Sequence, residues 1–173
     1  MVTVVAMVRL ETLLDSWKQV RQDTVQALED FPPGELDFKP AAELMSFREI
    51  ARHILDAGLA LSGLLLDGVT DFTVPGFRDS MRKYFSTLPP EAGVAELARE
   101  LRQSLEDCCG LLGAQTPEFF SGIVTRFDGQ QLTRAEMIQF AKEHELTHRA
   151  QMFLYLRLKG IVPPTTRRRQ ARK

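Results

Sequence analysis

Three pairs of adjacent prolines divide the chain, and each pair ends or precedes a long stretch without proline. The pairs are Pro32-Pro33, Pro89-Pro90 and Pro163-Pro164. Proline breaks a helix interior because it lacks an amide donor and clashes with the preceding turn. Between the pairs, apolar residues recur at spacings of three and four, which is typical of amphipathic helices. The chain is therefore predicted to be all-α.

The sequence predicts four long helices with clear start and stop signals. The motifs SFRE at 46–49 and TRAE at 133–136 are capping boxes, which satisfy free backbone amides at a helix start. Gly160 follows the final apolar stretch and is predicted to end it. The predicted helices span about 5–28, 46–67, 91–112 and 134–159.

The apolar spacing also predicts which side chains face the core. On the first helix these are Leu10, Leu13, Leu14, Trp17, Val20, Val25 and Leu28. On the last helix they are Met137, Ala141, His144, His148, Gln151 or Met152, Tyr155 and Leu158. Two histidines thus occupy positions where a core normally places leucine. On the third helix, Cys108 is predicted to pack in the core and Cys109 to lie off the apolar stripe, with no redox role for either.

Two segments between the helices depart from the helical pattern. The aromatic-rich segment 71–90 is predicted to contain one short helix at about 78–85, and loops of this length often cover a site. Asp128-Gly129 is a favoured hairpin turn between two short extended runs. The predicted architecture is a helical bundle with a short β-hairpin inserted before the last helix. Bundles often build metal sites from side chains on facing helices.

Charge is distributed unevenly along the chain. The C-terminal residues TTRRRQARK carry five basic side chains and no acidic one, which leaves 17 basic residues against 23 acidic ones elsewhere. Residues 165–173 are predicted to be a disordered tail that follows a single domain at 1–164. Because the body is acidic, no nucleic-acid partner is expected. The alternative is that the basic tail binds RNA, DNA or anionic lipid.

The remaining composition favours a cytoplasmic protein without membrane association. The apolar opening MVTVVAMV lacks the basic leader and the cleavage site of a secretory signal. The apolar run LALSGLLL at 59–66 is far shorter than the ~20 residues that span a bilayer. The two cysteines are adjacent and cannot link distant segments, which agrees with a reducing compartment.

Two of the three histidines lie in the motif HELTHRAQ at 144–151. His144 and His148 are four residues apart, so on a helix they lie one above the other and can bind one ion at ~2.0 to 2.1 Å each. His53 lies at the edge of the inner face of the second helix and is the natural third ligand. The alternative for His53 is a core histidine whose ring nitrogens are satisfied by hydrogen bonds.

HExxH is also the helix motif of zinc peptidases, in which the glutamate is the general base. That alternative is less favoured, because no Asp, Glu, His or Cys follows His148 to supply a third ligand. Glu145 is predicted to be a solvated surface carboxylate. Gln151 is predicted either to orient bound water or a ligand's second nitrogen, or to end the core stripe. Arg149 is predicted to pair with an acidic group of a neighbouring helix.

The stretches SFREIARHI and TRAEMIQFAKEHELTHRAQMFLYLRLKGIVPP resemble the DinB/YfiT-like metalloenzymes, and the likeness spans most of residues 7–164. The resemblance implies an up-down-down-up four-helix bundle. It also implies that His53, His144 and His148 bind a divalent ion, usually zinc or nickel. Ala150 stands where the family often has glycine, and it is small enough for the same close helix packing.

Three neutral histidine ligands leave at least one coordination position open, which is typical of a catalytic metal site. The resemblance implies a metal-dependent enzyme with a small-molecule substrate. Because related proteins include thiol-dependent transferases and isomerases, the leading hypothesis is a low-molecular-weight-thiol S-transferase or a related detoxification enzyme or isomerase. The alternative is a non-catalytic metal-binding or stress-response binding module. A homodimer is also expected, for which the apolar residues Phe153 and Leu154 are left over.

Overall fold

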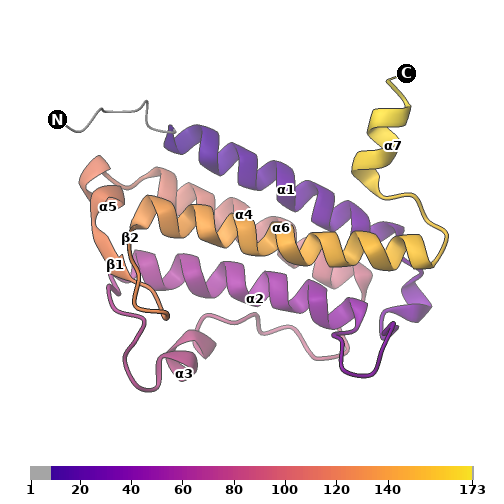
Figure 1. Ribbon diagram of the computed structural model, residues 1–173, viewed down its shortest axis with the longest axis horizontal. Helices are drawn as coiled ribbons and strands as arrows, with labels where there is room; N and C mark the ends of the chain where they lie inside the picture. Colours follow the sequence, from indigo (N-terminus) through magenta and orange to yellow (C-terminus); the bar gives the residue numbers. More distant parts are fainter. Residues whose placement is uncertain (1–8, 173) are drawn as a thin grey trace.

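The computed structural model describes residues 9–172, and four long helices dominate them. These helices are α1 (Leu10–Asp30), α2 (Phe47–Leu66), α4 (Val94–Gly113) and α6 (Arg134–Leu158). Each of α1 and α2 packs against both α4 and α6, so the four helices form a bundle. In Figure 1, α1 and α6 run in one direction while α2 and α4 run in the other. The predicted up-down-down-up four-helix bundle is confirmed.

Six shorter elements complete the described chain. They are the 3-10 helix η1 (Pro33–Glu35), the helices α3 (Phe77–Arg82), α5 (Pro117–Ser121) and α7 (Pro164–Gln170), and the strands β1 (Ile123–Thr125) and β2 (Gln131–Thr133). The two strands pair antiparallel with Val124 opposite Leu132, which confirms the predicted hairpin. Gly129 in its turn has φ of 83°, a conformation that glycine adopts without steric cost.

The helix ends follow the signals in the sequence. Ser46 and Thr133 each accept a hydrogen bond from a backbone amide in the first turn, and the glutamate three residues later closes a capping box. Gly160, with φ of 75°, follows the end of α6. The predicted start of the first helix at Val5 lies outside the described residues.

The core has two apolar parts with a polar layer between them. One part lies around Trp17, and the other lies around the stacked rings of Phe31 and Phe47. Along α1, Arg21 and Thr24 fall between Val20 of the first part and Val25 of the second, and both are buried. A polar layer in a bundle core requires partners for every buried group, and these partners come from α6 and α4.

The apolar stripe of α6 differs in detail from the prediction. Leu158 is exposed, and the buried positions include Ile138, Ala141, Glu145 and Met152. The stripe therefore runs beside the two histidines and leaves both of them on its edge. On α4 the two cysteines exchange roles, because Cys109 is buried and Cys108 is only partly buried. A rotation of the helix by a fraction of a turn is enough to exchange adjacent residues.

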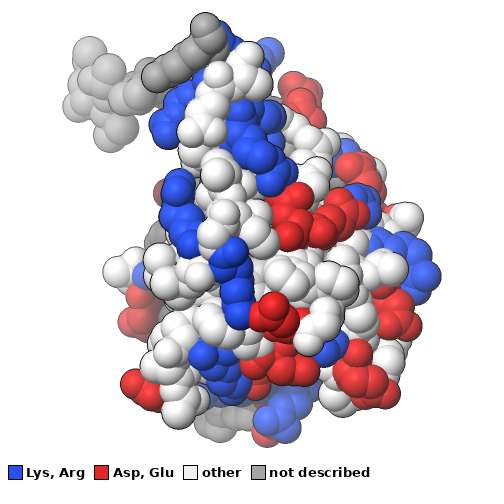
Figure 2. Space-filling model, turned by 90° about the vertical axis from the view of Figure 1, so that its right-hand side faces the viewer, with Lys and Arg blue, Asp and Glu red and all other residues white. Residues whose placement is uncertain are grey.

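The basic tail is also different from the prediction. Residues 164–170 form helix α7 instead of a disordered segment, and Pro164 occupies its first turn. Arg168 pairs with Asp23 at 2.6 Å and Arg167 with Asp30 at 2.6 Å, both on α1. Figure 2 looks onto the end of the molecule that carries α7 and shows basic side chains at the top, with acidic ones close by. Ion pairs to α1 thus give the tail a docking place that its composition did not indicate.

No helix within residues 9–172 combines the length and hydropathy needed to cross a membrane.

Candidate metal centre

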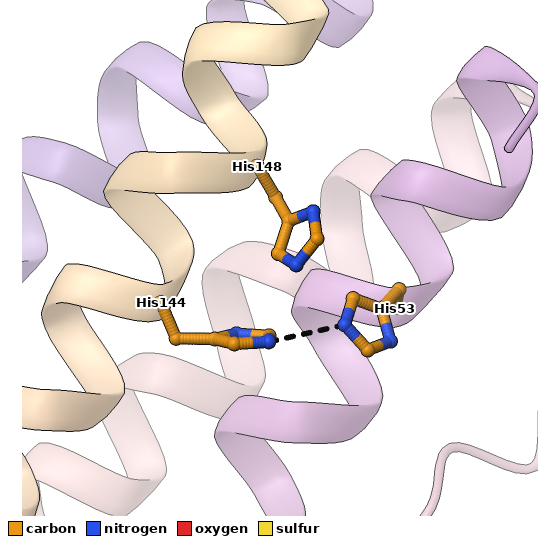
Figure 3. Close-up of side chains that lie close together, drawn as sticks. All are labelled: His53, His144 and His148. Atoms are coloured by element: carbon orange, nitrogen blue, oxygen red, sulfur yellow. Dashed lines mark hydrogen bonds between the residues drawn. The ribbon is translucent and has the colours of Figure 1, made fainter. Parts of the chain in front are cut away.

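Three imidazole rings from two adjacent helices meet at the side of the bundle. His53 lies on α2, and His144 and His148 lie one turn apart on α6, which packs against α2. Figure 3 shows the three rings turned toward one another. The Nε2 atoms of His53 and His144 are 3.1 Å apart, and one ring nitrogen from each histidine lies within 4.8 Å of the others. The predicted convergence of His53, His144 and His148 is therefore present in the fold.

The spacing of these nitrogens suits one divalent ion. Nitrogen atoms that bind one ion at ~2.0 to 2.1 Å are separated by roughly 3 to 3.4 Å. The separation of 3.1 Å between His53 and His144 falls in this range, and the nitrogen of His148 lies within 4.8 Å of both. Imidazole nitrogens suit zinc, nickel, copper and iron alike, so the donor set fits a divalent transition metal without selecting one.

Gln151 holds the ring of His148 from outside the cluster. The Nδ1 atom of His148 is 2.9 Å from Oε1 of Gln151, one turn further along α6. In a neutral imidazole, an Nδ1–H group that donates to this oxygen leaves a lone pair on Nε2. Of the two roles predicted for Gln151, the structure shows the hydrogen bond to the second nitrogen of a candidate ligand.

Desolvation favours the neutral, metal-binding form of two of the three rings, those of His53 and His144. Desolvation lowers the pKa of His144 to about 4, and the nearby rings of His148 and His53 add to this effect. Desolvation also lowers the pKa of His53 below its usual value, with a smaller contribution from His148. Both rings are therefore neutral at pH 7, and neutral nitrogen is the metal-binding form.

Glu145 is buried, and its predicted exposure was wrong. The residue is 2% exposed, and its carboxylate accepts hydrogen bonds from Trp17 Nε1 at 2.8 Å, from Thr24 Oγ1 at 2.8 Å, and from Arg21 at 2.8 and 2.9 Å. Arg21 donates further to the backbone oxygen of Leu101 on α4. A glutamate on a helix is normally predicted to be exposed, because burying an unpaired carboxylate is costly. Glu145 can be buried because donors on α1 satisfy its carboxylate, and the local sequence gives no sign of them.

Arg149 pairs with Asp23 of α1 at 3.3 Å, which confirms the predicted partner on a neighbouring helix. Its guanidinium also lies 5.1 Å from the ring centre of Phe153. Asp23 is shared with Arg168 of α7, so this carboxylate joins three helices, α1, α6 and α7. Arg149 therefore has a structural role on the side of α6 that faces α1, away from the imidazole cluster.

An open cavity of about 750 Å³ lies against two of the three rings. His53 and His144 line it together with Ala57 and Leu61 of α2, Phe140 of α6, and several residues of the segment that connects α2 to α4. From this segment, Phe72 and Phe77 contribute stacked rings whose centres are 4.7 Å apart. The segment that was predicted to cover a site thus lines this cavity, and it contains the predicted short helix as α3. The imidazole cluster is thus accessible to a small molecule in the cavity.

The sequence profile of the DinB family matches residues 4–172. The chain belongs to the DinB family. Among curated proteins it is similar to YuaE of Bacillus subtilis (strain 168), with 25% identity over 149 residues that cover 79% of this chain and 92% of YuaE. The likeness to the family predicted from the histidine motifs is therefore confirmed.

Solved structures show the same fold as this DinB-family chain. YfiT from Bacillus subtilis, described as a probable metal-dependent hydrolase with an unusual four-helix bundle topology, matches with a TM-score of 0.70 at 17% identity over 93% of each chain. A mycothiol-dependent maleylpyruvate isomerase matches with a TM-score of 0.63 at 17% identity, covering 84% of this chain and 61% of the isomerase. At 17% identity, these matches show a shared fold and no more.

In this DinB bundle, several contacts that the sequence did not indicate hold the cover of the cavity in place. The ring of Tyr84 lies over Gly63 of α2, where a Cβ atom would come within 2.3 Å of it. The Tyr84 hydroxyl donates to Asp67 at 2.6 Å, and the guanidinium of Arg52 donates to the backbone oxygens of Leu88 and Pro89. A glycine inside an apolar helix stretch is the one available signal for the Tyr84 contact.

Proposed function

We propose that the protein is a divalent-metal-dependent enzyme that acts on a small molecule in the cavity beside His53 and His144. One observation carries this proposal: three imidazoles converge, and a cavity of about 750 Å³ opens onto two of them, His53 and His144. A purely structural metal site is normally closed by four protein ligands. Within residues 9–172, no fourth Asp, Glu, Cys or His joins the three histidines.

The chain's own residues would hold and tune the ion. His53, His144 and His148 are the donors, and Gln151 fixes the tautomer of His148 through the contact at 2.9 Å. When bound, a divalent ion supplies Lewis acidity, which lowers the pKa of a nearby thiol or water toward neutrality. The phenylalanines of the cover exclude water from one side of the cavity. Zinc and nickel are the ions that we expect.

The finer proposal is a low-molecular-weight-thiol S-transferase or a related isomerase. In a transfer, the thiol gives its proton to solvent, its sulfur forms a bond to an electrophilic carbon, and the leaving group departs from that carbon with the bonding electron pair. In an isomerisation, the thiolate adds to the carbon, the adduct rotates about the bond that has become single, and the carbon–sulfur bond then breaks to release the thiolate. Support comes from the shared fold of the isomerase that depends on mycothiol. YfiT, described as a probable hydrolase, supports metal dependence and suggests water as the competing nucleophile.

The zinc-peptidase alternative does not fit the site. It requires Glu145 as a general base beside the ion. The carboxylate of Glu145 instead points to α1, where Trp17, Arg21 and Thr24 occupy its acceptor positions. A carboxylate with these partners is not free to take a proton from water at the imidazole cluster.

Metal analysis of the purified protein tests the coarser proposal. We expect about one divalent ion per chain in the unmodified protein and a loss of most of it in His53→Ala, His144→Ala and His148→Ala. Thr147→Ala is the matched control, because Thr147 lies on α6 between the two histidines with its hydroxyl bonded to the backbone of Glu143. Equal trace metal in all five proteins would overturn the metal site and leave a helical binding module.

A nucleophile assay tests the finer proposal. The zinc-loaded and the nickel-loaded protein are offered a chromogenic electrophile with bacillithiol, mycothiol, glutathione, cysteine or water alone. We expect turnover that requires both a metal and a thiol and is absent from His148→Ala. Turnover with water alone would replace the transferase by a hydrolase, and no turnover with any partner would favour the non-catalytic module. Homodimerisation remains a prediction that sedimentation of the same samples addresses.

A further inference from the structure

The cavity beside the imidazoles has three chemically different parts. His53 and His144 form its polar end, and the rings of four phenylalanines line its apolar wall: Phe72, Phe77, Phe127 and Phe140. Arg78, Asp79 and Arg82 of α3 add charged groups. A ligand that matches this cavity needs a reactive group for the polar end and an apolar body for the wall.

The apolar wall extends to the protein surface. Phe72 and Phe77 are buried and stacked, whereas Phe127 is 55% exposed and Val74 is 45% exposed at the cavity. Large exposed apolar side chains grouped around one concave site mark a ligand-contacting surface more often than isolated ones do. An aromatic or extended apolar body would cover Phe127 and Val74, which remain uncovered by the described residues.

Helix α3 brings two arginines and one aspartate to the cavity, so its net charge there is positive. Arg82 pairs with Asp79 at 3.2 Å, whereas Arg78 forms no hydrogen bond or ion pair with any residue of the described range 9–172. Arg126 nearby is already paired with Asp128. One guanidinium at the cavity is therefore free to bind an anionic group, and guanidinium binds carboxylates and similar anions through paired donors.

We infer that the cavity binds an amphipathic small molecule with an aromatic or apolar body and one anionic group, and that Arg78 pairs with that anion. The body lies against the phenylalanines, and the reactive centre is placed toward His53 and His144. This assignment of a substrate class rests on the proposed function for its chemistry. Binding of the class depends only on the cavity, so the two claims fail separately.

Two fluorescent probes that share an aromatic skeleton test the inference. 8-Anilinonaphthalene-1-sulfonate carries an anion, and N-phenyl-1-naphthylamine lacks it. Titrations use the full chain after treatment with a chelator and again after loading with zinc. For Arg78→Gln we expect the dissociation constant of the sulfonate to rise about three- to fivefold, with no change for the neutral probe. Arg99→Gln, an exposed position on α4, makes the same change in charge and leaves both constants unaltered.

A second pair of variants tests the apolar wall. Phe127 and Leu154 are exposed to 55% and 54%, but only Phe127 lines the cavity. We expect Phe127→Ser to weaken both probes severalfold and Leu154→Ser to weaken neither. Arg78→Lys keeps the charge but lacks the paired donors, so its affinity for the sulfonate should lie between those of the unmodified protein and Arg78→Gln. Equal effects of Arg78→Gln on the two probes, or equal effects of Phe127→Ser and Leu154→Ser, would overturn the inference. Failure of the unmodified protein to bind zinc, with probe binding retained, would overturn only the metal-dependent function.

Discussion

Glu145 and Arg21 form a two-point ion pair at the centre of the bundle, with side chains that are only 3% and 4% exposed. Nε and Nη2 of Arg21 donate to the two carboxylate oxygens, and the remaining acceptor positions are taken by Trp17 and Thr24. Because Glu145 directly follows His144, this ion pair sets how α6 is rotated against α1. The same rotation turns His144 and His148 toward α2.

Removing one partner of this ion pair is expected to be costly. Glu145→Gln leaves the guanidinium of Arg21 buried without a counter-charge, which should lower the free energy of unfolding by about 3 to 5 kcal/mol. Urea denaturation measures the loss. Glu143→Gln, two residues earlier and exposed, is the matched control and should change stability by no more than ~0.5 kcal/mol. The double variant Arg21→Met with Glu145→Met should cost less than Glu145→Gln alone, because no unpaired charge remains. Equal stability of Glu145→Gln and Glu143→Gln would contradict the burial of the pair.

Gln151→Leu tests the hydrogen bond that orients His148. Loss of the acceptor at 2.9 Å frees the ring to rotate and to change tautomer, so metal affinity should fall about 10- to 100-fold. Stability of the metal-free protein should barely change, since Gln151 is exposed. Competition with a chromophoric chelator measures the affinity, and Gln139→Leu on the same helix is the control. A metal affinity that is the same in both variants would show that His148 is oriented by other contacts.

The metal-free protein should lose stability as the pH falls from about 6.5 toward about 4. The pKa of His144 is lowered to about 4 in the fold by desolvation, and that of His53 is lowered in the same direction. Between these pH values the unfolded chain takes up a proton on His144 that the folded chain refuses, so protonation favours unfolding. Below about 4 both states are protonated at His144, and this contribution stops growing. Urea midpoints at pH 7, 6, 5 and 4 should decline less steeply in His144→Gln, and parallel profiles would refute the assignment.

Gly63→Ala should loosen the cover of the cavity without unfolding the bundle. A Cβ atom at position 63 would lie 2.3 Å from the ring of Tyr84, so the ring and the segment that carries it must move. We expect faster proteolysis within residues 67–93 and weaker binding of apolar probes. Gly110→Ala on α4 is the control, since its Cβ meets no atom within 4 Å, and it should stabilise the helix by about 0.5 to 1 kcal/mol. Unchanged cleavage of the cover in Gly63→Ala would show that Tyr84 does not hold it.

Sequence periodicity was sufficient for the four long helices, because apolar residues recur on each at spacings of three and four and two of the helices have complete capping boxes. The i,i+4 spacing of His144 and His148 was likewise sufficient for the convergence with His53 once α2 and α6 were neighbours. Periodicity could not predict the burial of Glu145, because the donors that satisfy its carboxylate lie more than 120 positions earlier in the chain. Helix α7 was missed for a similar reason, because its carboxylate partners Asp23 and Asp30 lie on α1.

Helices α2 and α4 run in the same direction, so the chain between them must return along the whole length of the bundle before α4 can begin (Figure 1). A short turn could join only antiparallel neighbours. That long return path is the segment that supplies α3 and, with Phe72 and Phe77, two of the four phenylalanines of the cavity wall. The topology thereby separates two tasks: the bundle helices keep the imidazoles in place, while the return path shapes one wall of the space beside them.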